Sequence, residues 1–146
     1  MDMSVEENLS MMKQLDDAWN ARDWKKAMKF HSKDVAVYWP GGNPPTMGRD
    51  DHEAEAIEFT KAFPDNKVWN NPYRVQFGQG DWTCTVTDFT GTMKGPMNMG
   101  GGKVAPPTNR SFKVDFCTVA HWKNGEIVDE KLFYDLIGML KQIGLM

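Results

Sequence analysis

Features that mark several large classes of protein are missing from this chain. It has two cysteines in 146 residues, Cys84 and Cys117, and each lies inside a segment that alternates like a strand. A disulfide framework is therefore excluded, and we expect two reduced thiols packed like valine side chains. No uncharged run approaches the length of a membrane span, and residues 1–7 lack the basic and apolar regions of a signal peptide. These absences predict a cytoplasmic protein without a membrane partner.

Clustered positive charge is also missing. The chain has 17 Lys and Arg against 20 Asp and Glu, which gives a net charge of −3. Its lysines are mixed with acidic residues along the helical segments, as on a solvated helix face. Because nucleic acids are bound by grouped Lys and Arg side chains, the composition argues against a nucleic-acid partner.

The usual signatures of nucleotide, metal and nucleophile chemistry do not occur either. The Gly-rich stretches 78–80 and 100–103 lack the context and spacing of a phosphate-binding loop. His31, His52 and His121 form no His-x-x-x-His pair, and the cysteines form no Cys-x-x-Cys motif, so a metal site is not expected. A Gly-x-Ser-x-Gly elbow is absent as well. What remains is carboxylate and imidazole chemistry.

The patterns that are present predict one α+β domain over residues 1–146. Helix patterns come first and alternating strands follow, an order typical of helices packed on one side of an antiparallel sheet. A capping box at Ser4-x-x-Glu7 begins the first helix, and another at Asp50-x-x-Glu53 begins the third. The predicted helices are 5–20, 24–30 and 50–63 with a short C-terminal helix, and the predicted strands are 35–39, 67–77, 82–93, 111–122 and 126–134.

Two further features bear on a binding site. A curved sheet that is covered by helices encloses a pocket at its open end, which is a common place for a small molecule. The segment 95–108 contains a glycine triplet and three prolines. It is therefore either a mobile lid over that pocket or a surface excursion.

The C-terminal hairpin carries the leading candidate for a catalytic group. Asn124-Gly125 between two alternating segments predicts a tight turn. Asp135 follows the returning strand and is flanked by apolar residues, so loss of hydration would raise the pKa of its carboxyl group and make it a general base. The other interpretation is a helix N-cap, in which backbone N–H donors stabilise the anion and weaken it as a base.

His121 lies near the end of the incoming strand, and its orientation depends on the register of the hairpin. A two-residue turn pairs His121 with Val128 and places it on the face opposite Asp135. A three-residue loop with a glycine bulge pairs it with Ile127 and places both candidates on one face. The third interpretation is a structural histidine at the sheet edge.

Several stretches from Phe63 onward carry a family resemblance. They are Phe63-Pro64-Asp65, Phe89-Thr90-Gly91-Thr92-Met93-Lys94-Gly95-Pro96, Pro107-Thr108 before Phe112, and the ending Asn124-Gly125-Glu126-Ile127-Val128 with Asp135, Leu140 and Gln142-Ile143-Gly144. In this order they resemble the SnoaL-like polyketide cyclases of the NTF2-like superfamily. The resemblance implies a cone, a curved antiparallel sheet wrapped around three N-terminal helices. It also implies homodimers or homotetramers and chemistry without a cofactor.

The resemblance further implies a reaction and two catalytic residues. Characterised cyclases of this kind close the last ring of a polyketide methyl ester by intramolecular aldol condensation. Carried over, Asp135 would remove a proton from the carbon between two carbonyl groups, and His121 would hydrogen-bond or protonate the oxygen that becomes the alcohol. Lys131 departs from the tryptophan that family members often have near this point. A lysine facing Asp135 would lower its basicity.

The expected ligand is a small apolar or aromatic carbonyl compound. Six Trp and eight Phe are more wide rings than a small core needs, although core packing or a dimer interface accounts for many of them. Three other functions fit the same fold, namely binding without turnover, other acid/base reactions such as isomerisation or epoxide hydrolysis, and dimerisation alone. The predicted pocket wall is Trp19, Trp39, Phe63, Trp82 and Phe133.

Overall fold

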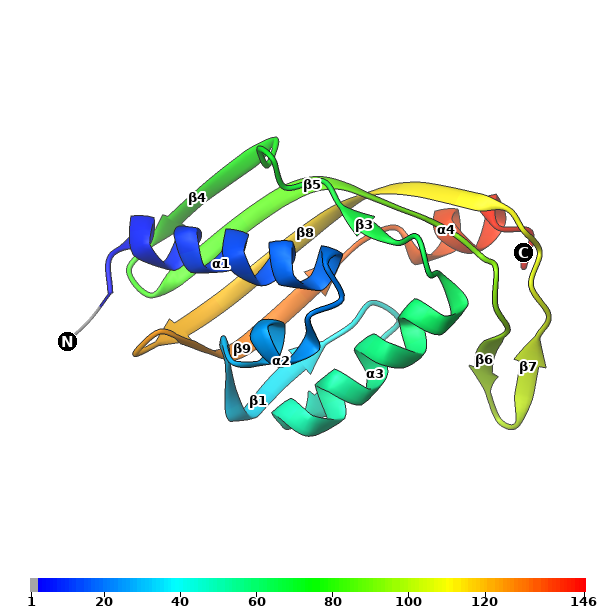
Figure 1. Cartoon of the computed structure of the whole chain (residues 1–146), viewed down its shortest axis with the longest axis horizontal. Helices are drawn as coiled ribbons and strands as arrows, with labels where there is room; N and C mark the ends of the chain where they lie inside the picture. The colour runs from blue at the N-terminus through cyan, green and yellow to red at the C-terminus, as the bar shows by residue number, and fades with distance from the viewer. Residues whose placement is uncertain (1–2) are drawn as a thin grey trace.

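The computed structural model describes residues 3–146, which form four helices and nine strands (Figure 1). The helices are α1 (Val5–Asn20), α2 (Trp24–Met28), α3 (Arg49–Ala62) and α4 (Leu136–Gln142). The strands are β1 (His31–Tyr38), β2 (Thr46–Met47), β3 (Lys67–Val68), β4 (Val75–Gln79), β5 (Trp82–Thr92), β6 (Met97–Gly100), β7 (Lys103–Ala105), β8 (Ser111–Lys123) and β9 (Glu126–Phe133). None of these helices is both long and apolar enough to span a membrane.

Seven strands form one curved, open sheet with the order β2-β1-β9-β8-β5-β3, and β4 also pairs with β5. The helices α1, α2 and α3 lie on its concave face (Figure 1), which confirms the predicted α+β cone. One detail differs from the antiparallel sheet that the sequence predicts, because β1 and β9 pair in parallel. Parallel neighbours need a crossover instead of a hairpin, and most of the chain lies between these two strands.

Local sequence signals account for some element boundaries and fail at others. Ser4 and Glu7 form the predicted capping box, with the Glu7 amide donating to Ser4 Oγ over 3.1 Å and the Ser4 amide donating to Glu7 Oε1 over 3.0 Å. The predicted cap at Asp50 is wrong, because α3 already begins at Arg49 behind Gly48, whose φ of 99° suits glycine. The second helix ends at Met28, so the following strand begins earlier than residue 35.

The predicted strand 67–77 is split into β3 and β4. Residues 69–74 connect the two strands and carry the ring of Tyr73 into the core, where it is 5% exposed. Its hydroxyl lies against α1, within 3.2 Å of the Met12 carbonyl oxygen. The interruption of the strand therefore brings a buried phenol to the first helix.

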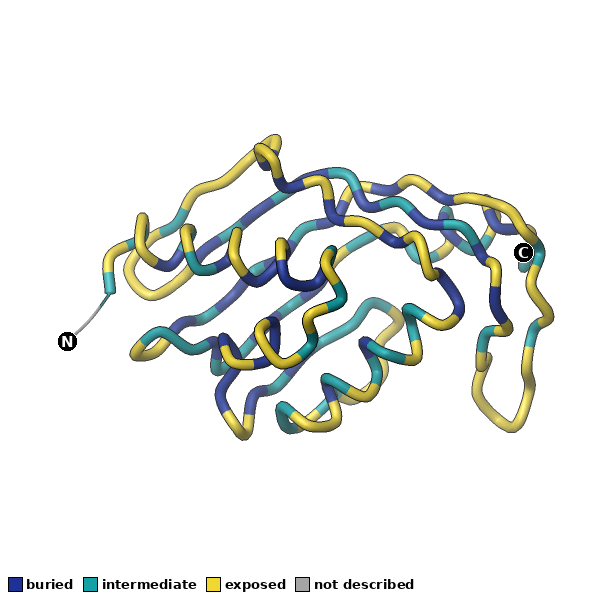
Figure 2. Tube along the Cα trace, in the orientation of Figure 1, coloured by how far each residue is buried: buried dark blue, intermediate teal, exposed yellow. Residues whose placement is uncertain are grey.

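The core fills the space between the helices and the concave face of the sheet (Figure 2). Alternation along β5 and β8 turns every second residue inward, and the rings of Phe89 and Phe112 meet there with centroids 5.3 Å apart. The β6–β7 hairpin, in contrast, is an exposed two-stranded ribbon (Figure 2). Cys84 and Cys117 are both free thiols, as expected, although they are half-buried rather than buried, with their Sγ atoms 3.7 Å apart.

Candidate functional site

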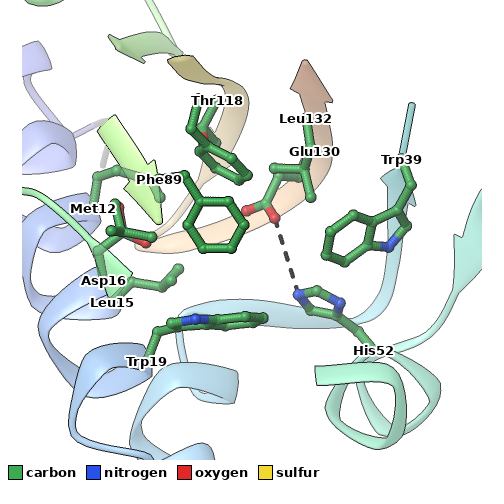
Figure 3. Close-up of a pocket in the computed structure, with 12 residues that line it drawn as sticks. Met12, Leu15, Asp16, Trp19, Trp39, His52, Phe89, Thr118, Glu130 and Leu132 are labelled. Carbon is green, nitrogen blue, oxygen red and sulfur yellow. Dashed lines mark ion pairs between the residues drawn. The ribbon is translucent and has the colours of Figure 1, made fainter. Parts of the chain in front are cut away.

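A cavity lies inside the cone, between α1, α3 and the concave face of the sheet (Figure 3). The volume open to the centre of a water molecule is about 30 Å³, enough for one or two waters. Its wall is mostly apolar, and three ionisable side chains interrupt it: Asp16, His52 and Glu130. We call this space the inner cavity.

Asp16 reaches the inner cavity from α1, where it follows Leu15 on the stripe of residues that faces the sheet. Tyr73 donates its hydroxyl to Asp16 Oδ2 over 2.6 Å and is the one hydrogen-bond donor to this carboxylate among residues 3–146. Burial raises the pKa of Asp16 from its ordinary 3.8 to about 7; the Tyr73 hydrogen bond opposes the rise, and the nearby charge of Glu130 adds to it. Asp16 is thus a carboxyl group that changes protonation state near neutral pH.

Glu130 reaches the inner cavity because of an irregularity in β9. Asn124 and Gly125 form the predicted turn, with φ angles of 50° and 81°. Trp122 then pairs with Ile127 but His121 pairs with Asp129, so one extra residue of β9 forms a bulge. Without the bulge the concave positions after Ile127 would be 129 and 131; with it they are 130 and 132.

Two histidines lie beside Glu130. His31 begins β1 and His52 lies in the first turns of α3, and their rings meet edge to face with centroids 4.8 Å apart. The Nε2 atom of His31 is 3.4 Å from Glu130 Oε2, and that of His52 is 4.0 Å from Glu130 Oε1. Burial favours the protonated form of Glu130, but the two imidazoles together outweigh it and hold the pKa of Glu130 below its ordinary value.

The other ring nitrogen of each histidine is held from outside the cluster. His31 Nδ1 lies 3.1 Å from the carbonyl oxygen of Ala27. His52 Nδ1 lies 2.8 Å from Glu55 Oε1, and Trp39 Nε1 donates to the same oxygen over 2.7 Å. These contacts fix both imidazole rings with Nε2 directed at Glu130.

A larger outer pocket of about 250 Å³ lies next to the inner cavity. Trp39 lines both spaces, so the two pockets adjoin at this side chain. Pro96, Met97 and Asn98 line the outer pocket, so the segment 95–108 is both a surface hairpin and part of a pocket wall. The rest of the wall is Glu55, Glu58, Phe59, Ala62, Phe63, Tyr134, Leu136 and Met139.

The model of the SnoaL-like polyketide cyclase family matches residues 9–143. The chain belongs to this family. No curated protein matches the sequence.

Similar solved structures agree with this assignment. One is a protein assigned as a SnoaL-like polyketide cyclase from Jannaschia sp. CCS1, with a TM-score of 0.83, 20% identity, and coverage of 100% of this chain and 99% of that chain. IdmH from Streptomyces antibioticus, assigned as a polyketide cyclase, has a TM-score of 0.74 and 22% identity, and the coverage is 94% and 98%. An NTF2-like protein from Burkholderia xenovorans LB400 has a TM-score of 0.74 and 18% identity, with coverage of 97% and 99%. At these identities the structures establish the fold alone.

The two catalytic candidates of this SnoaL-like chain lie outside both pockets. Asp135 is exposed and is the N-cap of α4, where its Oδ1 accepts from the Gly138 amide over 2.8 Å. The expectation that Asp135 is desolvated is therefore wrong, because apolar neighbours in sequence alternate between the two sides of the strand end. His121 lies on the convex face, stacked on Trp82 with ring centroids 4.4 Å apart.

The register of the hairpin is neither of the two that the sequence left open, because His121 pairs with Asp129 and not with Val128 or Ile127. The turn has two residues, yet the bulge further along β9 places His121 on the same face as Asp129, Lys131 and Phe133. Lys131 pairs with Asp129 over 2.8 Å, so the departure from the family tryptophan belongs to the convex face.

The five predicted wall residues divide between the two faces. Trp19 and Trp39 line the inner cavity, and Phe63 lines the outer pocket. Trp82 and Phe133 lie on the convex face, 41% and 53% exposed, and they contact neither pocket. Three of the five thus line one or the other of two adjoining pockets.

The sequence analysis missed the ionisable groups inside the cone. Asp16 had a usable signal, because an acidic residue on the stripe Met12, Leu15 and Trp19 interrupts an apolar helix face. Glu130 had none, because a bulge that no sequence feature marks decides its side of the sheet.

Proposed function

We propose that this SnoaL-like chain is an acid/base enzyme that closes a ring in an apolar carbonyl compound by intramolecular aldol condensation, with Asp16 as the general base. The observation that carries the proposal is the placement of the Asp16 carboxylate, which lies buried in an apolar cavity with a single hydrogen-bond donor. A base in such a place is poorly hydrated and has a pKa matched to neutral pH.

The reaction needs one proton shuttle. Asp16 removes a proton from the carbon between two carbonyl groups, and the resulting enolate attacks a second carbonyl carbon in the same molecule. The new carbon–carbon bond turns that carbonyl oxygen into an alkoxide, which takes the proton back from Asp16. Burial, together with the charge of Asp16, raises the pKa of Tyr73 far above its ordinary value, so its hydroxyl stays a donor and orients the carboxylate throughout.

The two pockets suggest which part of a substrate each of them would hold. The inner cavity has room for the reacting atoms only, whereas the outer pocket is large enough for a ring system. Trp39 lines both pockets, so a substrate that occupied both would contact its side chain. In this arrangement Trp19 and Phe89 pack against the reacting end.

A panel of aromatic methyl esters that carry a 1,3-dicarbonyl chain tests the proposal, with ring closure followed by chromatography and mass spectrometry. Asp16→Asn keeps the acceptor for Tyr73 but removes the base, and it should slow ring closure roughly 100-fold or more. Asp17→Asn is the matched control, because Asp17 is the adjacent, exposed residue and should retain the parent rate. The parent rate should rise with pH through about 7, as Asp16 becomes ionised.

Two results would overturn the role of Asp16. One is an unchanged rate in Asp16→Asn. The other is a loss of rate in Asp135→Asn with a native fold, which would assign the base to the end of the hairpin.

Ligand binding without turnover is the second candidate function, and the apolar outer pocket favours it. A thermal-shift screen of aromatic ketones and steroids would support it through tight binding without a product. Isomerisation or epoxide hydrolysis would use the same base on other substrates. Self-association as a homodimer or homotetramer stays a prediction, for which the exposed rings of Phe77, Trp82 and Phe133 on the convex face offer a surface.

A further inference from the structure

Three buried side chains from three separate elements converge beside the inner cavity. His31 comes from β1, His52 from α3 and Glu130 from β9, and they are 0%, 2% and 4% exposed. One potential ligand atom of each lies within 4.8 Å of the other two. Motifs based on sequence spacing cannot detect such a group, because its members are far apart in the chain.

The hydrogen bonds of the two histidines occupy their Nδ1 atoms and leave both Nε2 atoms facing Glu130. A carbonyl oxygen can only accept, so His31 must donate its Nδ1 proton to Ala27. His52 likewise donates its Nδ1 proton to the carboxylate of Glu55. Two ring nitrogens and a carboxylate therefore face one another, a group that is satisfied either by protons on the Nε2 atoms or by a metal ion among them.

The atoms at the centre of the cluster also lack partners. His31 Nε2 and Glu130 Oε2 are buried with no hydrogen-bond partner among the described residues, and they are 3.4 Å apart. That separation is too long for a good hydrogen bond. It matches the roughly 3.3 Å between two ligand atoms that each lie about 2.0–2.1 Å from a tetrahedral zinc ion.

We propose that His31, His52 and Glu130 bind a divalent transition-metal ion, with Zn²⁺ as the expected occupant. Two imidazoles and one carboxylate are a ligand set typical of such ions when one position is left open. The outer contacts of Ala27 and Glu55 with the two Nδ1 atoms are those that metal-binding histidines usually make.

The open position of this site faces the inner cavity, because His52 and Glu130 line the cavity (Figure 3) and His31 does not. A carbonyl oxygen placed there would be polarised by the metal while Asp16 removes the proton. This catalytic use rests on the proposed function, but metal binding itself does not. The two proposals can therefore fail separately.

Titration of the chelator-treated protein with Co²⁺ and Zn²⁺ tests the site. We expect one Co²⁺ per chain with visible d–d absorption, displacement of that absorption by Zn²⁺, and a higher unfolding temperature with either ion. His52→Asn keeps a donor near Glu55 but removes Nε2, so it should abolish the absorption. His121→Asn is the matched control, because the third histidine lies on the convex face and its loss should change nothing.

Glu55→Gln sharpens the test without touching a ligand. Loss of an outer contact to a metal-binding histidine typically weakens affinity about 10- to 100-fold, and we expect that loss here. The proposal is overturned if the parent protein gives neither absorption nor stabilisation, or if His52→Asn binds Co²⁺ as the parent does. Failure of Asp16→Asn to lower the ring-closure rate would leave the metal site intact and remove only the general base.

Discussion

The two faces of the β8–β9 hairpin place the same kinds of side chain in opposite environments. On the convex face His121 stacks on Trp82, and Lys131 pairs with Asp129, where all four side chains are at least partly exposed to water. On the concave face Glu130 is buried, and one of its oxygens has no hydrogen-bond donor among residues 3–146. The side of the sheet, and not the residue type, therefore decides whether an ionisable group loses its hydration and has its pKa shifted, as groups at functional sites often do.

The largest expected effect is the difference in stability lost when a phenylalanine is removed from the concave face or from the convex face. Phe112 is 2% exposed and its ring meets those of Phe63 and Phe89 edge to face, so Phe112→Ala should lower the free energy of unfolding by about 3–5 kcal/mol. Phe133 is 53% exposed, and Phe133→Ala should change it by roughly 0.5 kcal/mol or less. Urea unfolding measures both values. Equal losses would mean that the convex face is covered, as in a dimer.

A second effect concerns the pH dependence of stability. Because the pKa of Asp16 is raised from 3.8 to about 7, the folded protein holds this proton between those values while the unfolded chain releases it. The free energy of unfolding should therefore fall as pH rises from about 4 to about 7, by on the order of 3 kcal/mol from this group. Asp16→Asn should remove that slope and be more stable than the parent at pH 8.

Exposed Asp17 gives the control for this measurement. Partial burial is the largest single effect and raises the pKa of Asp17, but the Lys13 and Asn70 hydrogen bonds and the charges of Lys13 and Lys26 together outweigh it and hold this pKa below its ordinary value. Asp17 therefore contributes stability that is lost only in acid. Asp17→Asn should keep the decline between pH 4 and pH 7. Chemical denaturation at a series of pH values checks both variants, and a decline that persists in Asp16→Asn would contradict the assignment.

The sequence predicts those features of the fold that depend on interactions between neighbouring residues. The Asn124-Gly125 turn, the capping box of α1 and the alternation of β5 and β8 each follow from neighbouring residues, and all three are present. The fold class follows from their order along the chain. Asp135 shows the limit, because the cap interpretation and the catalytic interpretation share one local sequence, and only the N-cap bond is present.

The candidate site depends instead on contacts between distant segments. His31 and Glu130 are 99 positions apart and meet because β1 pairs in parallel with β9. Glu130 faces inward only because of the bulge, and Tyr73 reaches Asp16 only because the strand before it is interrupted. Periodicity cannot anticipate a single-residue irregularity, since a shift of one residue reverses every side chain that follows.

The smallest expected effect concerns Asp135, the carboxylate that remains in water. Asp135→Ala removes the acceptor for the Gly138 amide and should lower the free energy of unfolding by about 1 kcal/mol, whereas Asp135→Asn keeps an acceptor and should lower it by a few tenths at most.

A side chain at Gly138 would collide with the Asp135 carboxylate. The carboxylate relieves this collision only by moving away from the Gly138 amide, so in the parent the lost N-cap bond of about 1 kcal/mol should cancel most of the gain from alanine, the better helix former. In the Asp135→Ala background the collision is gone, so Gly138→Ala should stabilise the protein by roughly 0.5–1 kcal/mol. Urea unfolding of the four proteins in this double-mutant cycle measures the difference between the two effects of Gly138→Ala. A cycle without coupling would mean that Asp135 does not cap α4, and its carboxylate would then be free for another role.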